Sequence, residues 1–142
     1  MSLDFVLDSS VTMAWFFQDE AGSSSDELLD ELNRDGRAVV AMHWALEVGN
    51  TLLVAERRKR CSVADTAHYV GILNALPIEV DSETATNAAT TTLALARSHE
   101  LTLYDGAYLE LAMRRKLPLA TLDRDLRAAA KRVGVECLPK KV

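Results

Sequence analysis

The sequence predicts an α/β protein, namely a three-layer α/β/α sandwich around a mainly parallel sheet of about five strands. Short apolar segments alternate with one or two amphipathic helical segments along all 142 residues. The apolar segments are continuously apolar, which is typical of parallel strands that are covered on both faces. No internal repeat, low-complexity tract or shift in composition divides the chain, so we expect residues 1–142 to form a single domain.

The first strand is expected at residues 3–7, which are mostly apolar and are followed by Asp8-Ser9-Ser10, a cluster typical of a helix start. Helical spacing then continues over residues 11–17. Residues 22–25, Gly-Ser-Ser-Ser, predict a loop with capping residues. The leucines after it predict a helix that ends near Asp35-Gly36.

A second strand is expected at residues 39–41, Val-Val-Ala. Helical spacing of apolar residues then predicts a helix over residues 44–58 and another over residues 64–76, which Pro77 closes. Residues 78–80 read as a third strand, because they are short, extended in pattern and bounded by turn-forming residues.

The last part of the chain predicts three helices and two strands. A long helix rich in Ala and Thr is expected over residues 83–99, with Asp81 or Ser82 as its cap. Tyr104-Asp105-Gly106 predicts a turn that opens a helix ending before Pro118. The remaining elements are a strand at 119–121, a helix at 124–133 and a strand at 135–138.

Composition bounds the class of protein. No apolar run approaches the roughly 18 to 20 residues of a membrane span, and no secretory or import signal precedes the first strand, so we expect a cytoplasmic protein. Cys61 and Cys137 have neither the spacing of metal ligands nor the density of a disulfide framework. We therefore expect both to be free thiols.

The net charge of −5 argues against a protein that binds nucleic acid through broad neutralisation of phosphates. This objection weakens if clustered acids are neutralised by bound cations. Basic clusters are also present, and each either contacts phosphate or forms a solvated helix end. They are Arg57–Arg60, Arg114–Lys116 and Lys131–Arg132.

Four acids stand where a site is expected. In open parallel sheets, ligands bind outside the carboxyl ends of the strands. Asp8 and Asp123 follow strands, Asp105 opens a helix, and Glu47 lies about one turn into another. Each Asp has an alternative explanation as a helix cap. Glu47 falls on the apolar side of its helix, where a lone carboxylate is costly to hold, so Glu47 favours a functional role most directly.

Carboxylates that share a pocket repel one another and need protons or cations, and oxygen ligands select Mg²⁺ or Mn²⁺. His43, His68 and His99 are too scattered for a zinc site. Carboxylate-held Mg²⁺ or Mn²⁺ suits phosphodiester hydrolysis, because the cation lowers the pKa of a bound water and stabilises the leaving oxygen. The hydroxyls of Ser9, Ser10 and Thr121 either support the acids or complete caps and turns.

The segments around these acids resemble those of the PIN domain family, and in particular its VapC-type toxins of toxin–antitoxin pairs. The resemblance covers essentially the whole chain in the family's order. The matching segments are Val6-Leu7-Asp8-Ser9-Ser10-Val11, Leu46-Glu47-Val48-Gly49-Asn50, Tyr104-Asp105-Gly106-Ala107-Tyr108-Leu109 and Leu119-Ala120-Thr121-Leu122-Asp123-Arg124-Asp125-Leu126.

The resemblance implies a three-layer PIN-like fold and Mg²⁺- or Mn²⁺-dependent endoribonuclease activity. It implies an RNA substrate, a homodimer, and a small antitoxin that covers the site. By position, the acidic quartet corresponds to Asp8, Glu47, Asp105 and Asp123. Thr121 matches a hydroxyl residue that often precedes the last acid. Asp125 is either an outer ligand or an acid that complements the helix dipole.

Two other functions stay open. A phosphohydrolase with Asp8 as nucleophile fits the same kind of sheet, but Ser10 stands where that class carries a second Asp. A PIN-like module that binds RNA or protein without cutting is the other alternative, and the intact quartet argues against it. For an antitoxin, Trp15, Phe16 and Phe17 offer part of a docking groove, although burial of at least two of them in the core is the stronger expectation.

Overall fold

The computed structural model describes residues 2–17 and 23–141. Its sheet has five parallel strands in the order β3-β2-β1-β4-β5. The strands are β1 (Asp4–Leu7), β2 (Arg37–Val40), β3 (Ile78–Val80), β4 (Leu119–Ala120) and β5 (Cys137–Leu138). The predicted α/β/α fold with a mainly parallel sheet of about five strands is confirmed.

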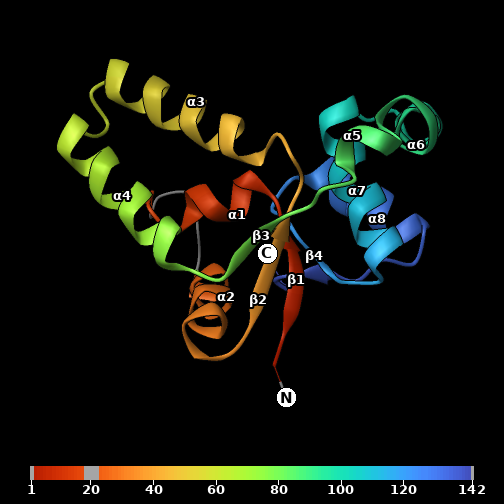
Figure 1. Cartoon of the computed structure of the whole chain (residues 1–142), viewed down its shortest axis with the longest axis horizontal. Helices are drawn as coiled ribbons and strands as arrows, with labels where there is room; N and C mark the ends of the chain where they lie inside the picture. The colour runs from red at the N-terminus through yellow and green to blue at the C-terminus, as the bar shows by residue number, and fades with distance from the viewer. Residues whose placement is uncertain (1, 18–22, 142) are drawn as a thin grey trace.

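Helices cover both faces of the sheet, with α1 to α4 on one side and α5 to α8 on the other (Figure 1). After their exposed first residues, Asp4 and Arg37, the strands β1 and β2 are apolar, as expected for strands covered on both faces, and Phe5, Val6 and Leu7 of β1 have no exposed surface. The first group is α1 (Ser9–Ala14), α2 (Ser23–Arg34), α3 (Trp44–Arg57) and α4 (Val63–Ala75). The second group is α5 (Thr84–Asn87), the π-helical segment η2 (Ala88–Thr92), α6 (Leu93–His99), α7 (Leu103–Arg115) and α8 (Arg124–Arg132).

Helix ends differ from the sequence expectations in the first third of the chain. Helix α1 ends at Ala14 and does not continue to Phe17. Ser23, Ser24 and Ser25, expected in a loop, belong to α2, and Gly22 lies outside the described residues. Serine has only a modest penalty in a helix, so its presence marks a helix start as readily as a loop.

The helix expected over residues 83–99 is broken by the wider π turn of η2. Here side chains compete for backbone carbonyls. The Asn87 amide donates to the Glu83 carbonyl at 3.0 Å, and the Thr90 hydroxyl donates to the Asn87 carbonyl at 3.4 Å. Such local hydrogen bonds loosen the regular α-helical pattern.

The prediction of a turn at Tyr104-Asp105-Gly106 is wrong, because these residues lie inside α7. Thr102 caps this helix, and its hydroxyl accepts from the Asp105 N–H at 3.1 Å. Gly106 serves close packing instead of a turn, since a Cβ there would lie 3.2 Å from the Ala96 Cβ of α6. Close contact with α6 therefore fixes the start of α7, which carries Asp105.

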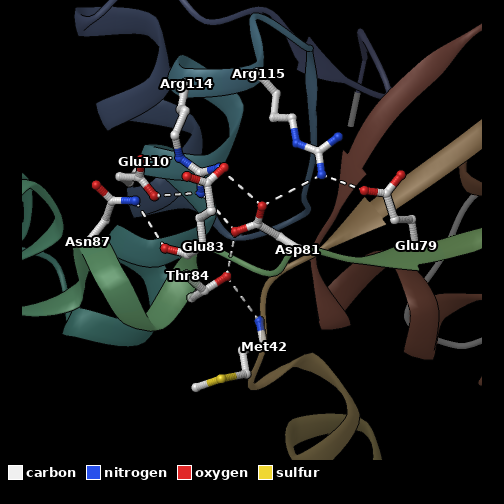
Figure 2. Close-up of polar contacts among 9 residues, drawn as sticks. All are labelled: Met42, Glu79, Asp81, Glu83, Thr84, Asn87, Glu110, Arg114 and Arg115. Atoms are coloured by element: carbon white, nitrogen blue, oxygen red, sulfur yellow. Dashed lines mark hydrogen bonds and ion pairs between the residues drawn. The ribbon is translucent and has the colours of Figure 1, made fainter.

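An ion-pair network anchors the other end of α7 to the end of β3 (Figure 2). Arg114 donates to both carboxylate oxygens of Asp81, at 3.0 and 2.7 Å, and to Glu110 at 2.8 Å. Arg115 donates to Glu79 at 2.5 Å. Asp81 therefore binds an arginine, and does not cap a helix as the sequence suggested. Two members of the basic cluster 114–116 are held by acids and do not face solvent as a free cationic patch.

Three smaller expectations can be compared with the structure. Cys61 and Cys137 are free thiols. Among the described residues, no helix is long and apolar enough to cross a membrane. Trp15 and Phe17 are buried, and Phe16 stacks on Tyr69 with ring centroids 4.4 Å apart, so these aromatic residues mainly serve the core.

Candidate active site

The structure brings the four predicted acids together along one cleft at the carboxyl edge of the sheet. The cleft has a volume of about 460 Å³. Its lining contains no lysine, arginine or histidine among the described residues. The lining residues are Asp8, Ser9, Ser10, Met13, Glu47, Thr51, Asp105, Leu122 and Asp123.

The pairing of β1 with β4 places Asp8 beside Thr121. Leu7 pairs with Ala120, so the next residue of each strand leaves the sheet at the same point. The Thr121 hydroxyl donates to the Asp8 carboxylate at 2.5 Å, and Asp8 is only 3% exposed. Asp8 also caps α1, where its carboxylate accepts from the Ser10 N–H.

Hydroxyl groups hold Asp8 and connect it to the loop that precedes α8. The Ser9 and Ser10 hydroxyls donate to the two Asp8 carboxylate oxygens at 3.2 and 3.0 Å. The Ser10 hydroxyl also accepts from the Leu122 N–H at 2.9 Å, and the Thr121 hydroxyl accepts from the Asp123 N–H at 3.1 Å. These contacts fix the Asp8 carboxylate and combine both roles that the sequence left open for the hydroxyls.

Glu47 lies at the edge of the apolar face of α3, with a side chain 33% exposed. We expected its helical neighbours Trp44, Val48 and Thr51 to form the apolar side of this helix. Trp44 and Val48 are buried, but Thr51 is exposed. The Tyr108 hydroxyl donates to the Glu47 carboxylate at 2.5 Å. The carboxylate is therefore held by a residue of α7, although it lies on a partly solvated face.

The role of Tyr108 was not predicted from the sequence, in which Tyr108 fits the apolar pattern of its helix. The ring is fully buried, and a buried tyrosine hydroxyl usually has a hydrogen-bond partner. Tyr108 also follows Asp105 by three positions, so both lie on the same face of α7. His43 completes this group, with its Nε2 3.7 Å from the Glu47 carboxylate and its ring against Tyr108.

Asp105 and Asp123 reach the cleft from two helix starts. Asp123 caps α8, where its carboxylate accepts from the Leu126 N–H at 2.9 Å. Asp105 lies in the first turn of α7 and is not the cap, which is Thr102. Asp125 is exposed and does not line the cleft.

The electrostatics of the cleft favour a bound cation. Burial, together with the neighbouring charges of Asp8, Asp123 and Glu47, raises the pKa of Asp105 to about 6. As the side chains stand, no three His, Cys, Asp or Glu residues of the described part of the chain are grouped closely enough to hold a metal ion. The donor set nevertheless fits a hard divalent cation, because it consists of carboxylate oxygens with no basic side chain among them.

The raised pKa of Asp105 predicts a gain in stability when its charge is removed. The folded-state pKa of Asp105 lies above the ordinary value, so the folded protein favours the protonated carboxyl. The contribution of this carboxyl to folding stability is therefore complete below about pH 4 and is lost as pH rises through about 6. Without metal, Asp105→Asn should therefore melt higher than the wild type at pH 7.5, by about 3 °C, and show no advantage at pH 4.5. Thermal melts in EDTA measure this. Asp125→Asn, outside the cleft, is the matched control, and an equal gain in that variant contradicts the interpretation.

Comparison with known proteins identifies a matching family model and solved structures of similar fold. The family model described as PIN domain matches residues 5–132. A crystal structure of a Pyrobaculum aerophilum protein is similar over 97% of this chain and 92% of its own, with TM-score 0.70 and 23% identity. A search of curated proteins found no match.

Two further similar structures are named as toxin–antitoxin assemblies. VapBC2 of Rickettsia felis, bound to a DNA fragment from its promoter, has TM-score 0.65 and 12% identity, and covers 95% of this chain and 97% of its own. A toxin–antitoxin complex of Klebsiella pneumoniae has TM-score 0.58 and 14% identity, with 87% and 90% covered.

Proposed function

Because the chain belongs to the PIN domain family, whose members are generally nucleases, we propose that it is a Mg²⁺- or Mn²⁺-dependent endoribonuclease and the toxin of a toxin–antitoxin module. The observation that carries the proposal is the cleft in which Asp8, Glu47 and Asp105 meet Asp123 without a basic side chain among the described residues of the lining. The chemistry that a divalent cation supplies in such a site is activation of a water molecule and stabilisation of the leaving oxygen.

The chain's own residues orient the ligands. Ser9, Ser10 and Thr121 fix the Asp8 carboxylate, and Tyr108 fixes that of Glu47. Preorganised ligands of this kind lose little entropy when they bind a cation or position a substrate. An aspartate nucleophile at Asp8 is less well supported, because hydrogen bonds occupy both carboxylate oxygens and the residue is almost fully buried.

The proposal of RNA cleavage predicts a metal requirement. Purified protein incubated with single-stranded RNA should produce discrete fragments in Mg²⁺ or Mn²⁺ and none in excess EDTA, and sequencing of the fragment ends would identify the cleaved positions. A DNA strand of the same sequence is the control. Cleavage that persists in EDTA, or an absence of cleavage in every metal for folded protein, contradicts the proposal.

The proposal of a toxin is supported by the names of the similar structures, which include toxin–antitoxin complexes. In this role the chain acts as a homodimer on cellular RNA and is inhibited by a small antitoxin that covers the cleft. Expression of the chain alone should arrest growth, and coexpression with the adjacent small open reading frame should restore growth and yield a copurifying complex.

Tyr108→Phe should weaken cation binding without unfolding the protein. The change removes only the hydroxyl that holds Glu47 and keeps the buried ring. Loss of such a supporting hydrogen bond typically reduces metal affinity by about 10-fold or more. The measurement is the Mg²⁺ concentration that gives half of the maximal rise in melting temperature. Tyr104→Phe, at an exposed tyrosine one turn earlier, is the matched control and should match the wild type.

A further inference from the structure

Arg57 and Arg58, near the end of α3, differ in their pairing from the arginines of the other two basic clusters. Arg114 and Arg115 are bound by acids, and Arg132 donates to His99 at 3.2 Å. Arg57 and Arg58 are exposed, and neither has an acidic partner within the described ranges 2–17 and 23–141. In a chain with net charge −5, Arg57 and Arg58 therefore place two positive charges at this turn without an acidic partner among the described residues.

This positive turn adjoins the acidic cleft. A second hollow, of about 210 Å³, is lined by Phe17, Asn50, Thr51, Val54, Ala55, Arg58 and Arg60. Thr51 lines both this hollow and the acidic cleft, so the two adjoin at α3. We call this second hollow the α3 groove.

The α3 groove has a polar surface and a fixed aromatic base. Asn50 and Thr51 are exposed, whereas Phe17 is buried beneath them. The Arg60 guanidinium lies over the Phe17 ring, 4.9 Å from its centroid. Such a surface suits a charged, hydrated chain better than the apolar face of a helix, because the lining presents few large exposed apolar side chains.

The length of the path suits a short nucleic-acid strand. Arg58 follows Glu47 by eleven positions on α3, and this corresponds to a rise of about 16 Å along the helix. At about 3.4 Å per stacked nucleotide, the path spans roughly five nucleotides. Arginine is the preferred partner of phosphate, because its guanidinium donates in pairs to phosphate oxygens.

We propose that the α3 groove binds the single-stranded RNA segment that adjoins the cleaved bond, with Arg58 contacting its phosphates. This inference rests on the proposed ribonuclease function. The cleft itself presents only acids to the strand, so the positive charge of Arg58 beside it attracts the phosphates that the acids do not. Asn50 and Thr51 lie between Arg58 and the cleft, where they contact the strand on its way to the acids.

The test measures binding of a labelled 12-nucleotide single-stranded RNA to protein carrying Asp8→Asn, so that cleavage does not interfere. Arg58→Glu should weaken binding roughly tenfold at moderate salt and reduce the slope of log affinity against log salt by about 0.7 or more. Asn50→Asp, which adds one negative charge with almost no change in size, should weaken binding in the same direction. Lys131→Glu is the matched control, because Lys131 is exposed and belongs to α8, a helix on the opposite side of the sheet from α3 (Figure 1).

Each outcome of this test supports or overturns the proposal. Loss of binding in Arg58→Glu and Asn50→Asp, with Lys131→Glu near the parent value, supports the α3 groove as the RNA path. Equal loss of RNA binding in all three variants shows a general charge effect and overturns the proposal. The proposal is also overturned if the groove variants bind RNA normally and lose only their binding to a coexpressed antitoxin. If the wild type cleaves RNA with Mn²⁺ but the groove variants bind RNA as well as their Asp8→Asn parent does, this inference fails alone. If the wild type neither binds nor cleaves RNA, the ribonuclease proposal fails as well.

Discussion

Asp8→Asn should lower RNA cleavage by at least about 100-fold while the protein remains folded. Asp8 has the most fixed carboxylate of the site, because Ser9, Ser10 and Thr121 all donate to it. The amide keeps the size of the side chain but loses one anionic oxygen ligand, and changes to groups that act in the reaction commonly cost about two or more orders of magnitude.

The measurements must distinguish a loss of catalysis in Asp8→Asn from a loss of folding. Cleavage rates of the wild type and of Asp8→Asn should be measured on the same RNA in Mn²⁺, together with circular dichroism and melting temperature. Asp125→Asn provides the matched control, because it makes the same chemical change at an exposed residue outside the cleft. A folded Asp8→Asn variant with wild-type activity would falsify the assignment of Asp8.

Arg114→Ala should cost about 3 kcal/mol of unfolding free energy, the largest stability effect that we expect from a single charged residue here. Arg114 neutralises Asp81 and Glu110, whose side chains are only 1% and 4% exposed. Its removal leaves two buried carboxylates without their main cation (Figure 2). Urea denaturation measures the loss. Arg115→Ala is the comparison and should cost less, about 1 kcal/mol, because its hydrogen-bond partner Glu79 is 43% exposed and its ion pair with Asp81 is longer, at 3.6 Å.

The effect of Arg114→Ala should also depend on pH. Burial opposes ionisation of Asp81, but hydrogen bonds from Arg114 and Thr84 hold the pKa of that carboxyl below its ordinary value. For a lowered pKa, the stabilising contribution is present above the ordinary value and is lost as pH falls through the folded-state value. The difference between wild type and variant should therefore shrink below about pH 4. A difference that grows in acid would contradict this account.

The fold was largely predictable because its main signal is local. Continuous apolar runs identify strands that are covered on both faces, and these runs were enough to predict a parallel sheet. Asp8 and Asp123 each follow a predicted strand, and this was enough to expect both at the carboxyl edge of the sheet. The break in the helix at η2 was not predictable from periodicity, because it depends on which carbonyls Asn87 and Thr90 contact.

The details of the site were less predictable because they depend on contacts between elements. Thr102 and Asp105 are both good capping residues, and only the structure shows that Thr102 takes the cap and frees Asp105 for the cleft. The hydrogen bond between Tyr108 and Glu47 requires α3 and α7 to meet, which no local pattern encodes. For the same reason, the pairing of Asp81 with Arg114 was missed.

The central claim is that these acids form a metal-dependent ribonuclease site. The most direct measurement is the rate of single-stranded RNA cleavage by the wild type and by Asp8→Asn across a titration with Mn²⁺. We predict a wild-type rate that rises from zero in EDTA to a plateau, and a rate for the variant at least about 100-fold lower at every Mn²⁺ concentration. Equal rates for the two proteins, or a wild-type rate that is independent of Mn²⁺, would contradict the claim.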